Sequence, residues 1–201
     1  MPAAAATAGR SDYAINCGDR DVVEGNAGPD RTGRPTNHNT ARAWDNDPAR
    51  PWRWDSSGVP LNVVVFNEVT NAEFLSGVSF RRSTVAEKSV IADVTDGTTN
   101  TYLIGEKYMS IPNWDTGLDL GDNETWCTGF NNDNFRSAFY TPFPDGEVDT
   151  AQTRNSYGSA HSGGVFFVWC DGHVSMESFD IDRFVHRGNA NRGDQGRPFQ
   201  A

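Results

Sequence analysis

The sequence has few lysines, few cysteines and no long hydrophobic run. Only 2 of its 17 basic residues are lysine, and 27 acidic residues give a net charge of −10. This balance argues against nucleic-acid binding, because neutralising phosphates takes a basic surface. No apolar stretch approaches the ~18 residues of a membrane span, and the first residues lack the basic and apolar regions of a secretory signal. We therefore expect a soluble chain without a signal or anchor of its own.

Cysteine is also scarce. Cys17, Cys127 and Cys170 are too few and too scattered for a disulfide framework or a zinc cluster, and no two form a Cys-x-x-Cys pair. One disulfide with one free thiol and three free thiols both remain open. Apolar residues make up only 36% of the chain, which is below the usual share for globular domains. We expect a modest core under long polar loops.

Turn-forming residues are abundant. The chain contains 19 Asp, 17 Asn, 20 Gly and 10 Pro but only 8 Glu, and this ratio disfavours a helical bundle. We predict an α+β, β-rich fold with an antiparallel sheet, long Asp/Asn/Gly loops and short peripheral helices. At this length we expect a single globular domain over 1–201, with frayed ends at 1–10 and 194–201.

β-branched runs bounded by turn residues predict the strands. An Asp-Gly turn at 171–172 joins two such runs into the clearest hairpin of the sequence. The three strands expected at the centre of the sheet are 101–108, 164–170 and 173–179, and two further runs with strand character are 61–69 and 77–85.

A short helix is predicted over 180–188. It has an acidic start, Phe184 and Val185 as buried anchors, and Gly188 as its end. The Pro-rich stretch before residue 60 carries three tryptophans, so we expect an ordered but irregular layer there and not a flexible linker.

Four motifs together resemble a known family. They are DYAINCGD (12–19), TDGTTNTYLIGEK (95–107), GDNETWCTGFNNDNFR (121–136) and SAHSGGVFFVWCDGHV (159–174). The last places His161 ten positions before Asp171 and its glycine. In this order the motifs resemble the planctomycete-type DUF1559 proteins, the prepilin-like H-X9-DG family. The resemblance covers nearly the whole chain, from residue 11 to 193.

The resemblance implies an exported, envelope-associated head of the pseudopilin sort, with assembly or surface binding as its role. Its implied partners are other pseudopilin or envelope components, and it implies no reaction. In that family a prepilin signal and a long hydrophobic helix precede the head. The chain lacks both, so it resembles the carboxy-terminal part of such a protein and should behave as a soluble head.

An acidic stretch is the candidate metal site. Calcium takes six to eight oxygen ligands, which flexible Asp/Asn/Gly loops can supply. The resemblance adds to this expectation, since pseudopilin heads often hold calcium in a carboxy-terminal loop. The alternative without a metal ion is a solvated loop in which Asp and Asn side chains hydrogen-bond to the backbone of their own turns. The predicted Ca²⁺ ligands are Asp115, Asp119, Asp122 and Glu124, completed by Asp133 from the polar run 131–134.

No complete catalytic constellation is present in the sequence, and an enzyme is the less favoured interpretation. His161 is the candidate catalytic residue of an alternative, a calcium-dependent hydrolase of small esters or lactones, in which the metal polarises a carbonyl or water. Cys170 and His173 could face each other across the hairpin, although nothing supplies a third group to orient them. Packing of Cys170 as a small hydrophobe is the alternative.

A second alternative is a carbohydrate-binding module. Exposed indoles among Asp and Asn suit stacking on a sugar ring, whereas most loop tryptophans instead fasten loops to a sheet. The ligand would be a glycan or another small molecule. The tryptophans in question are Trp44, Trp52, Trp54, Trp114 and Trp126.

Overall fold

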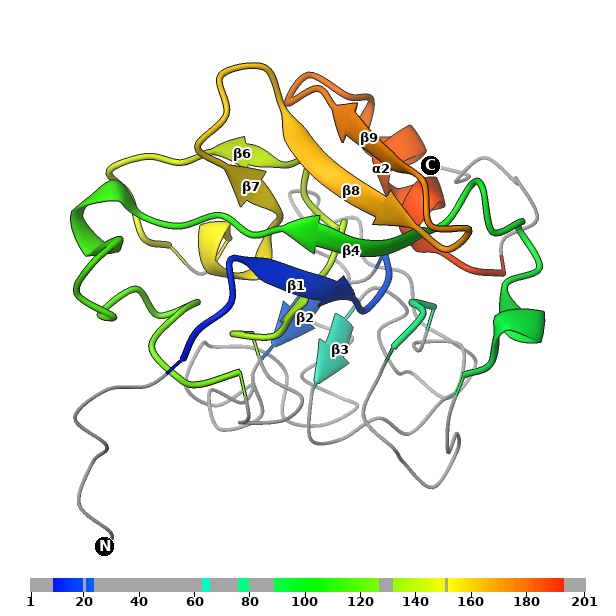
Figure 1. Cartoon of the computed structure of the whole chain (residues 1–201), viewed down its shortest axis with the longest axis horizontal. Coiled ribbons are helices and arrows are strands. Elements are labelled where there is room, and N and C mark those ends of the chain that lie inside the picture. Colours follow the sequence, from blue (N-terminus) through cyan, green and yellow to red (C-terminus); the bar gives the residue numbers. More distant parts are fainter. Residues whose placement is uncertain are drawn as a thin grey trace, which may run out of the picture.

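A computed structural model describes residues 9–19, 21–23, 63–65, 76–79, 89–126, 132–150 and 152–193. Within them the fold is α+β and β-rich, as the sequence predicts (Figure 1). The tryptophan-rich stretch before residue 60 and most of the run 77–85 lie outside the described residues. No helix of the described part is long and apolar enough to cross a membrane.

The main sheet has five strands in the order β5-β1-β4-β8-β9. Neighbouring strands from β1 to β9 are antiparallel, whereas β5 pairs parallel with β1, so the sheet is mixed. The strands are β1 (Tyr13–Asn16), β4 (Tyr102–Glu106), β5 (Phe135–Arg136), β8 (Val165–Trp169) and β9 (Val174–Glu177).

The predicted hairpin is confirmed. Strands β8 and β9 pair antiparallel with Val165 opposite Glu177 and Val168 opposite Val174. Gly172 has a φ of 93°, the left-handed conformation that glycine adopts without strain, which explains the Asp-Gly turn. One expectation is wrong, because β9 lies at the edge of the described sheet and not at its centre. Strand β1 takes an inner position instead. It pairs with β4 and β5, which are far away in the sequence, so no local sequence pattern predicts this position.

The remaining elements are short. Strand β2 (Asp21–Val23) pairs parallel with β3 (Val63–Val65), inside the predicted run 61–69, and β6 (Phe143–Pro144) pairs parallel with β7 (Gly158–Ser159). Three single turns of 3₁₀ helix are η3 (Ile91–Asp93), η4 (Ile111–Asn113) and η5 (Thr153–Asn155).

The core lies on one face of the sheet. Tyr102 of β4 stacks on Phe167 of β8 with 4.0 Å between ring centroids, and Trp169 packs beside them. Gly105 leaves room for the rings, since a side chain there would run into Phe167 and Tyr157. The buried cluster consists of Tyr102, Ala138, Tyr157, Val165, Phe167, Trp169 and Ala190.

Helix α2 (Arg183–Ala190) covers part of this core face. The carboxylate of Asp182 caps it by accepting hydrogen bonds from the backbone N–H of Phe184 and Val185. The position of this start decides which side chains of the helix face the core. The prediction that Phe184 and Val185 are its buried anchors is wrong. Phe184 and Val185 are exposed, and the buried residues are His186, Arg187 and Ala190. The helix also continues past Gly188 to Ala190.

Candidate functional site

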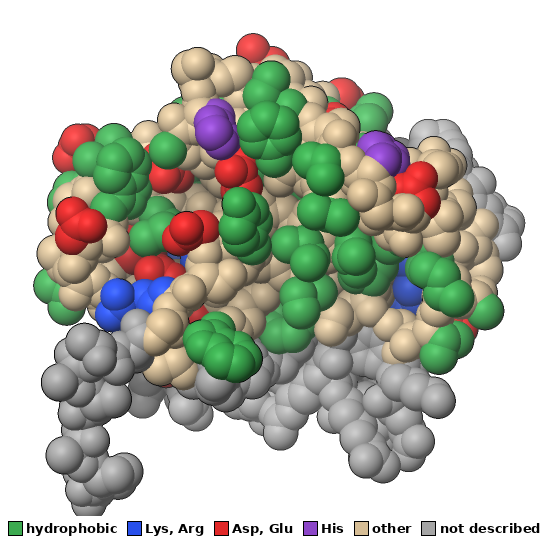
Figure 2. All heavy atoms as spheres, viewed as in Figure 1, with side chains coloured by type: hydrophobic (Ala, Val, Ile, Leu, Met, Phe, Trp, Pro, Cys, Tyr) green, Lys and Arg blue, Asp and Glu red, His purple; other side chains and the backbone are tan. Residues whose placement is uncertain are grey.

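The outer face of the sheet carries exposed apolar side chains. Because side chains alternate along a strand, the residues between the core positions of β1, β8 and β9 point away from α2. Among these outward residues Tyr13 is 56% exposed, Phe166 38%, Val174 59% and Met176 50%. Figure 2 shows hydrophobic side chains gathered on this side of the molecule, over the strands labelled in Figure 1. We call Tyr13, Ile15, Ile104, Phe166, Val168, Val174 and Met176 the outer face.

His161 lies at one end of the outer face. Its Nε2 is 3.3 Å from Oε1 of Glu106, and its ring stands edge-on to Phe166 at 5.1 Å. The second oxygen of Glu106 accepts a 2.8 Å hydrogen bond from the backbone N–H of Phe166. The backbone N–H of His161 donates to Ser159 Oγ. Within the described residues no serine or cysteine side chain bonds the imidazole, so the pair Glu106–His161 has no adjacent nucleophile.

The hairpin tip holds the other half of the predicted motif. His173 donates its backbone N–H to the Asp171 carboxylate, and its Nδ1 lies 2.7 Å from the same oxygen. These hydrogen bonds lower the pKa of the exposed Asp171 carboxyl. The imidazole also stacks on Trp169 at 5.1 Å. Asp171 and His173 therefore fix the turn.

Cys170 does not form a dyad with His173. Its thiol faces the carbonyl oxygen of Tyr102 at 3.8 Å, and burial raises its pKa to about 11. Cys17 is buried too, and its thiol donates to the Arg136 carbonyl. Burial raises the pKa of Cys17 as well. Both described cysteines are free, and their raised pKa values keep both thiols neutral near pH 7 and therefore poor nucleophiles.

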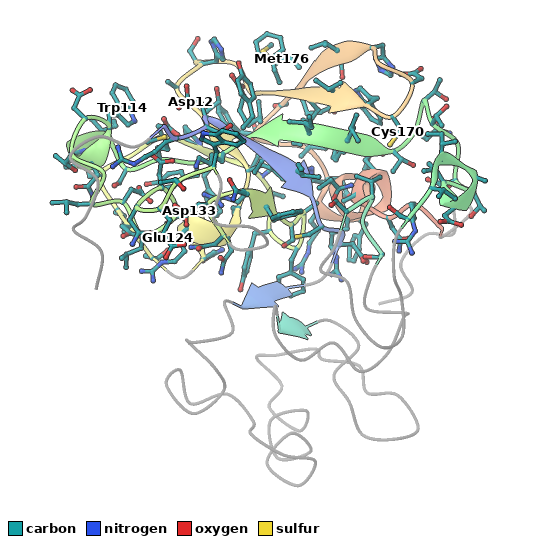
Figure 3. The ribbon with its side chains drawn as sticks, turned by 60° about the horizontal axis from the view of Figure 1, so that its bottom comes forward. Asp12, Trp114, Glu124, Asp133, Cys170 and Met176 are labelled. Carbon is teal, nitrogen blue, oxygen red and sulfur yellow. The ribbon has the colours of Figure 1, made fainter. Side chains whose placement is uncertain are left out.

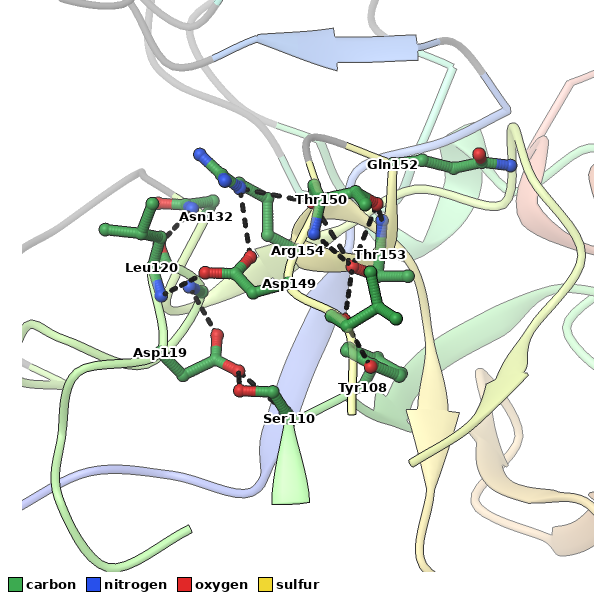
Figure 4. Close-up of polar contacts among 12 residues, drawn as sticks. Tyr108, Ser110, Asp119, Leu120, Asn132, Asp149, Thr150, Gln152, Thr153 and Arg154 are labelled. Carbon is green, nitrogen blue, oxygen red and sulfur yellow. Dashed lines mark hydrogen bonds and ion pairs between the residues drawn. The ribbon is translucent and has the colours of Figure 1, made fainter. Parts of the chain in front are cut away.

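Predicted metal ligands of the acidic stretch accept hydrogen bonds from donor groups of the protein itself. Asp119 is buried, and its carboxylate accepts hydrogen bonds from the backbone N–H and hydroxyl of Ser110 and from the N–H of Gly121 (Figure 4). In the same figure Asp149 pairs with Arg154 at 3.4 Å. Asp149 also accepts a 3.5 Å hydrogen bond from the backbone N–H of Leu120, so it links the loop that follows η4 to the segment around η5, whereas Asp119 fastens that loop to Ser110.

Asp122 pairs with a buried lysine. Lys107 Nζ lies 2.5 Å from Asp122 Oδ1 and also donates to the carbonyls of Gly121 and Asp133. Arg136 donates to the same Gly121 carbonyl at 2.9 Å and to Ser156 at 3.1 Å. Both cations are almost fully buried. Two internal positive charges therefore sit where the sequence suggests a calcium ion.

Burial dominates the electrostatics of this cluster. Desolvation lowers the pKa of Lys107 and raises that of Asp122, although the pairing of the two opposes both shifts. Desolvation also lowers the pKa of Arg136 to about 10. Arg136 is therefore charged near pH 7. The contacts among the three groups offset part of the cost of burying them.

Of the other predicted ligands, Asp133 lies beside this pair, since its carbonyl accepts a hydrogen bond from Lys107. Glu124 donates its backbone N–H to Asp133 Oδ1, which places the two residues side by side (Figure 3), and Asp115 is exposed. In the described ranges no group of three or more His, Cys, Asp and Glu side chains is placed to hold a metal ion. The calcium site therefore stays a prediction.

Sequence reasoning missed several residues of this region. Lys107 is one of only two lysines, a signal that could have drawn attention to it. Asp145 accepts hydrogen bonds from the Met109 N–H and the Trp114 indole, and burial raises its pKa to about 6. Trp114 thus fastens a loop through its N–H, although its ring is still 45% exposed. Trp126 is exposed, and the three earlier tryptophans lie outside the described residues.

Comparison with known proteins identifies the family. The model of a family described as "Protein of unknown function (DUF1559)" matches residues 7–183, which is well over half of the chain. The chain belongs to the DUF1559 family. No curated protein and no solved structure matches it. The matched range of this DUF1559 protein contains the main sheet, the outer face and the Lys107–Asp122 pair, and it ends at the first residue of α2.

Proposed function

We propose that this DUF1559 protein is a non-enzymatic, pseudopilin-like head that docks onto other envelope components through its outer face. The observation that carries the proposal is the exposure of apolar side chains on three strands of one sheet, the paired strands β8 and β9 and, beyond β4, strand β1. Contiguous apolar surface of this kind is typical of interaction sites, whereas single exposed hydrophobes are ordinary. Family membership agrees with the proposal but carries no function of its own.

The chemistry of the described residues also favours binding over catalysis. His161 is held by Glu106 without a nucleophile, the described thiols are neutral, and the acidic residues near Asp119 are engaged by backbone and lysine donors. Each of these groups has a structural partner that accounts for its position. Under this proposal the Glu106–His161 pair forms the polar rim of the docking surface.

Photo-crosslinking tests the docking role. A benzoylphenylalanine is placed at Phe166 on the outer face or at Phe184 on α2, two phenylalanines that are 38% and 41% exposed. In cells that produce the protein, ultraviolet light should give a discrete adduct with an envelope component from position 166 and none from position 184. No adduct from position 166, or the same adducts from both positions, would contradict the proposal.

The alternatives require different ligands. A calcium-dependent hydrolase would turn over members of an ester and lactone panel in calcium and lose this activity with chelator. A carbohydrate-binding module would bind a glycan array without turnover. No contact among the described residues singles out either one. Calcium bound at the residues around Asp119 would be structural under our proposal, and its effect on stability is testable.

A further inference from the structure

Strand β9 has an open hydrogen-bonding edge in the described structure. The backbone N–H of Trp169 donates to the carbonyl of His173, so these two residues form a hydrogen-bonded pair. Such pairs alternate along an antiparallel ladder. Val174 and Met176 are therefore the residues whose N–H and C=O groups point away from β8. No described backbone group hydrogen-bonds to them from the other side.

Strand β9 lacks several of the usual protections of an edge strand. Natural sheets guard their edges with lysine, proline, bulges, inward-pointing charges or very short edge strands. Strand β9 is short and places Glu177 on the core side, but it contains no lysine, proline or bulge. Strand β9 reads Val-Ser-Met-Glu, and its pairing with β8 is regular over all four residues. Val174 and Met176 are exposed on the outer face. An extended strand with an apolar side could therefore continue the sheet at this edge.

The sequence of β9 is complementary to itself. In an antiparallel pairing centred on Ser175, Val174 lies opposite Met176 of the second copy, and Glu177 lies opposite His173 of the second copy. The first pair is apolar and lies on the outer face, while the second joins an acid to an imidazole on the opposite face. His173 uses Nδ1 for Asp171, so Nε2 is the ring nitrogen that remains for Glu177 of the second copy. Cross-strand pairs of both kinds stabilise sheets.

We propose that two copies of this chain pair through β9, antiparallel and with Ser175 on the twofold axis. The pairing satisfies the outward N–H and C=O groups of Val174 and Met176 in each copy. It also joins the two outer faces into one continuous apolar surface. The inference rests on the proposed function, since it names one partner for a protein whose role is assembly. A twofold axis needs only this one patch, used by both copies.

The net charge of the two copies makes their pairing depend on salt concentration. Each copy carries a net charge of −10, and this long-range repulsion opposes association. Salt screens such repulsion, with a Debye length of about 10 Å at 0.1 M. The paired fraction should therefore rise when salt is added at constant protein concentration. A contact held mainly by attraction between opposite charges would respond in the opposite direction.

Cysteine trapping tests the register. Ser175 would face its own copy in a pair without backbone hydrogen bonds, where Cα atoms lie about 4.5 Å apart and a disulfide can form. Ser175→Cys should give a covalent dimer on mild oxidation. Ser178→Cys, at an exposed position past the end of β9, should stay monomeric, as should the parent with its natural cysteines. Absence of the Ser175→Cys dimer, or equal cross-linking at 178, would overturn the register.

Sedimentation velocity separates the edge from the face. Met176→Lys should raise the dissociation constant of the dimer at least about tenfold, because it removes an apolar cross-strand pair and puts a charge at the edge. Phe166→Ser, on β8 inside the sheet, should leave this constant nearly unchanged. If Phe166→Ser abolishes the dimer, the copies stack face to face and the β9 pairing is wrong. A monomeric parent whose outer face still captures envelope components would refute this inference and leave the proposed function standing.

Discussion

Lys107 and Arg136 place two positive charges under the acidic loops. Each donates to the carbonyl of Gly121, and Lys107 also pairs with Asp122. An internal lysine satisfies carboxylate and carbonyl oxygens together, which is the task the sequence suggested for calcium. Removing one partner of such a pair is costlier than never having it, because the other charge stays buried.

Lys107→Met should therefore destabilise the protein strongly. The change leaves Asp122 and the carbonyls of Gly121 and Asp133 without their shared donor, and we expect a loss of about 3–5 kcal/mol in the free energy of unfolding. Urea denaturation of the parent and the variant measures this loss. Lys107→Met with Asp122→Leu, which removes both charges, should recover part of it. A loss within 0.5 kcal/mol, the usual range of surface substitutions, would contradict the role given to Lys107.

His186 makes stability depend on pH. The imidazole is fully buried against Tyr102, Tyr157 and Phe167, and desolvation lowers its pKa from 6.5 to about 3. Below pH 6.5, His186 therefore binds a proton in the unfolded chain but stays neutral in the folded chain until the pH approaches 3. The stability contributed by neutral His186 is present above pH 6.5 and is lost as the pH falls toward 3, at up to about 1.4 kcal/mol per pH unit.

His186→Phe should remove this dependence. The difference in the free energy of unfolding between parent and variant should shift by more than 1 kcal/mol in favour of the variant on going from pH 7 to about pH 5. Asp145, whose pKa is raised to about 6, acts in the opposite direction. It is present in both proteins and cancels in the comparison. A constant difference between the two pH values would mean that His186 takes up its proton as readily in the folded state as in the unfolded one.

At the scale of elements, local patterns were predictable and long-range pairings were not. The β8–β9 hairpin follows from two extended runs and an Asp-Gly turn, all within a few residues. The parallel pairing of Ile15 with Phe135 joins segments far apart in the chain. The buried face of α2 depends on where Asp182 starts the helix, so an error at the start misplaced its anchors.

The candidate site was hidden for a related reason. Strand β8 is apolar on both faces, a pattern typical of a strand buried on both sides. The described elements cover only the side of Phe167 and Trp169. Sequence alone cannot tell which side of such a strand stays open. Lys107 was missed because its acidic partner, Asp122, comes from a loop beyond the strand, and only the folded chain brings the two together.

Gly105 tests how tightly the core face is packed. A Cβ at this position would lie 2.5 Å from Phe167 and 2.7 Å from Tyr157, well inside normal contact. Gly105→Ala should therefore cost about 1–3 kcal/mol in the free energy of unfolding. Gly193→Ala, whose Cβ would have its nearest neighbour at 3.7 Å, is the matched control and should cost little. Equal denaturation midpoints for the two variants would show that the aromatic rings can move aside.

At the scale of the whole molecule, an excess of negative charge must be offset. The calcium prediction and the internal cations are two ways to do so, and thermal melting distinguishes them. A bound calcium ion at about 100 times its dissociation constant adds about 2.7 kcal/mol, or roughly 5–11 °C in melting temperature. Asp115→Asn, which changes an exposed predicted ligand, should reduce that rise. If neither calcium nor chelator changes the melting temperature, the calcium prediction is wrong. Lys107 and Arg136 are then the cations that offset the charge of the acidic loop.

Oxidative footprinting tests most directly whether the outer face is a docking surface. Hydroxyl radicals label exposed aromatic and sulfur side chains, and labelling is compared between the purified protein and the envelope fraction of producing cells. Tyr13, Phe166 and Met176 should be labelled in the purified protein and protected in the envelope. Trp114 and Phe184, of similar exposure but off the outer face, should be labelled equally in both. Equal labelling of all five residues in both preparations would contradict the account.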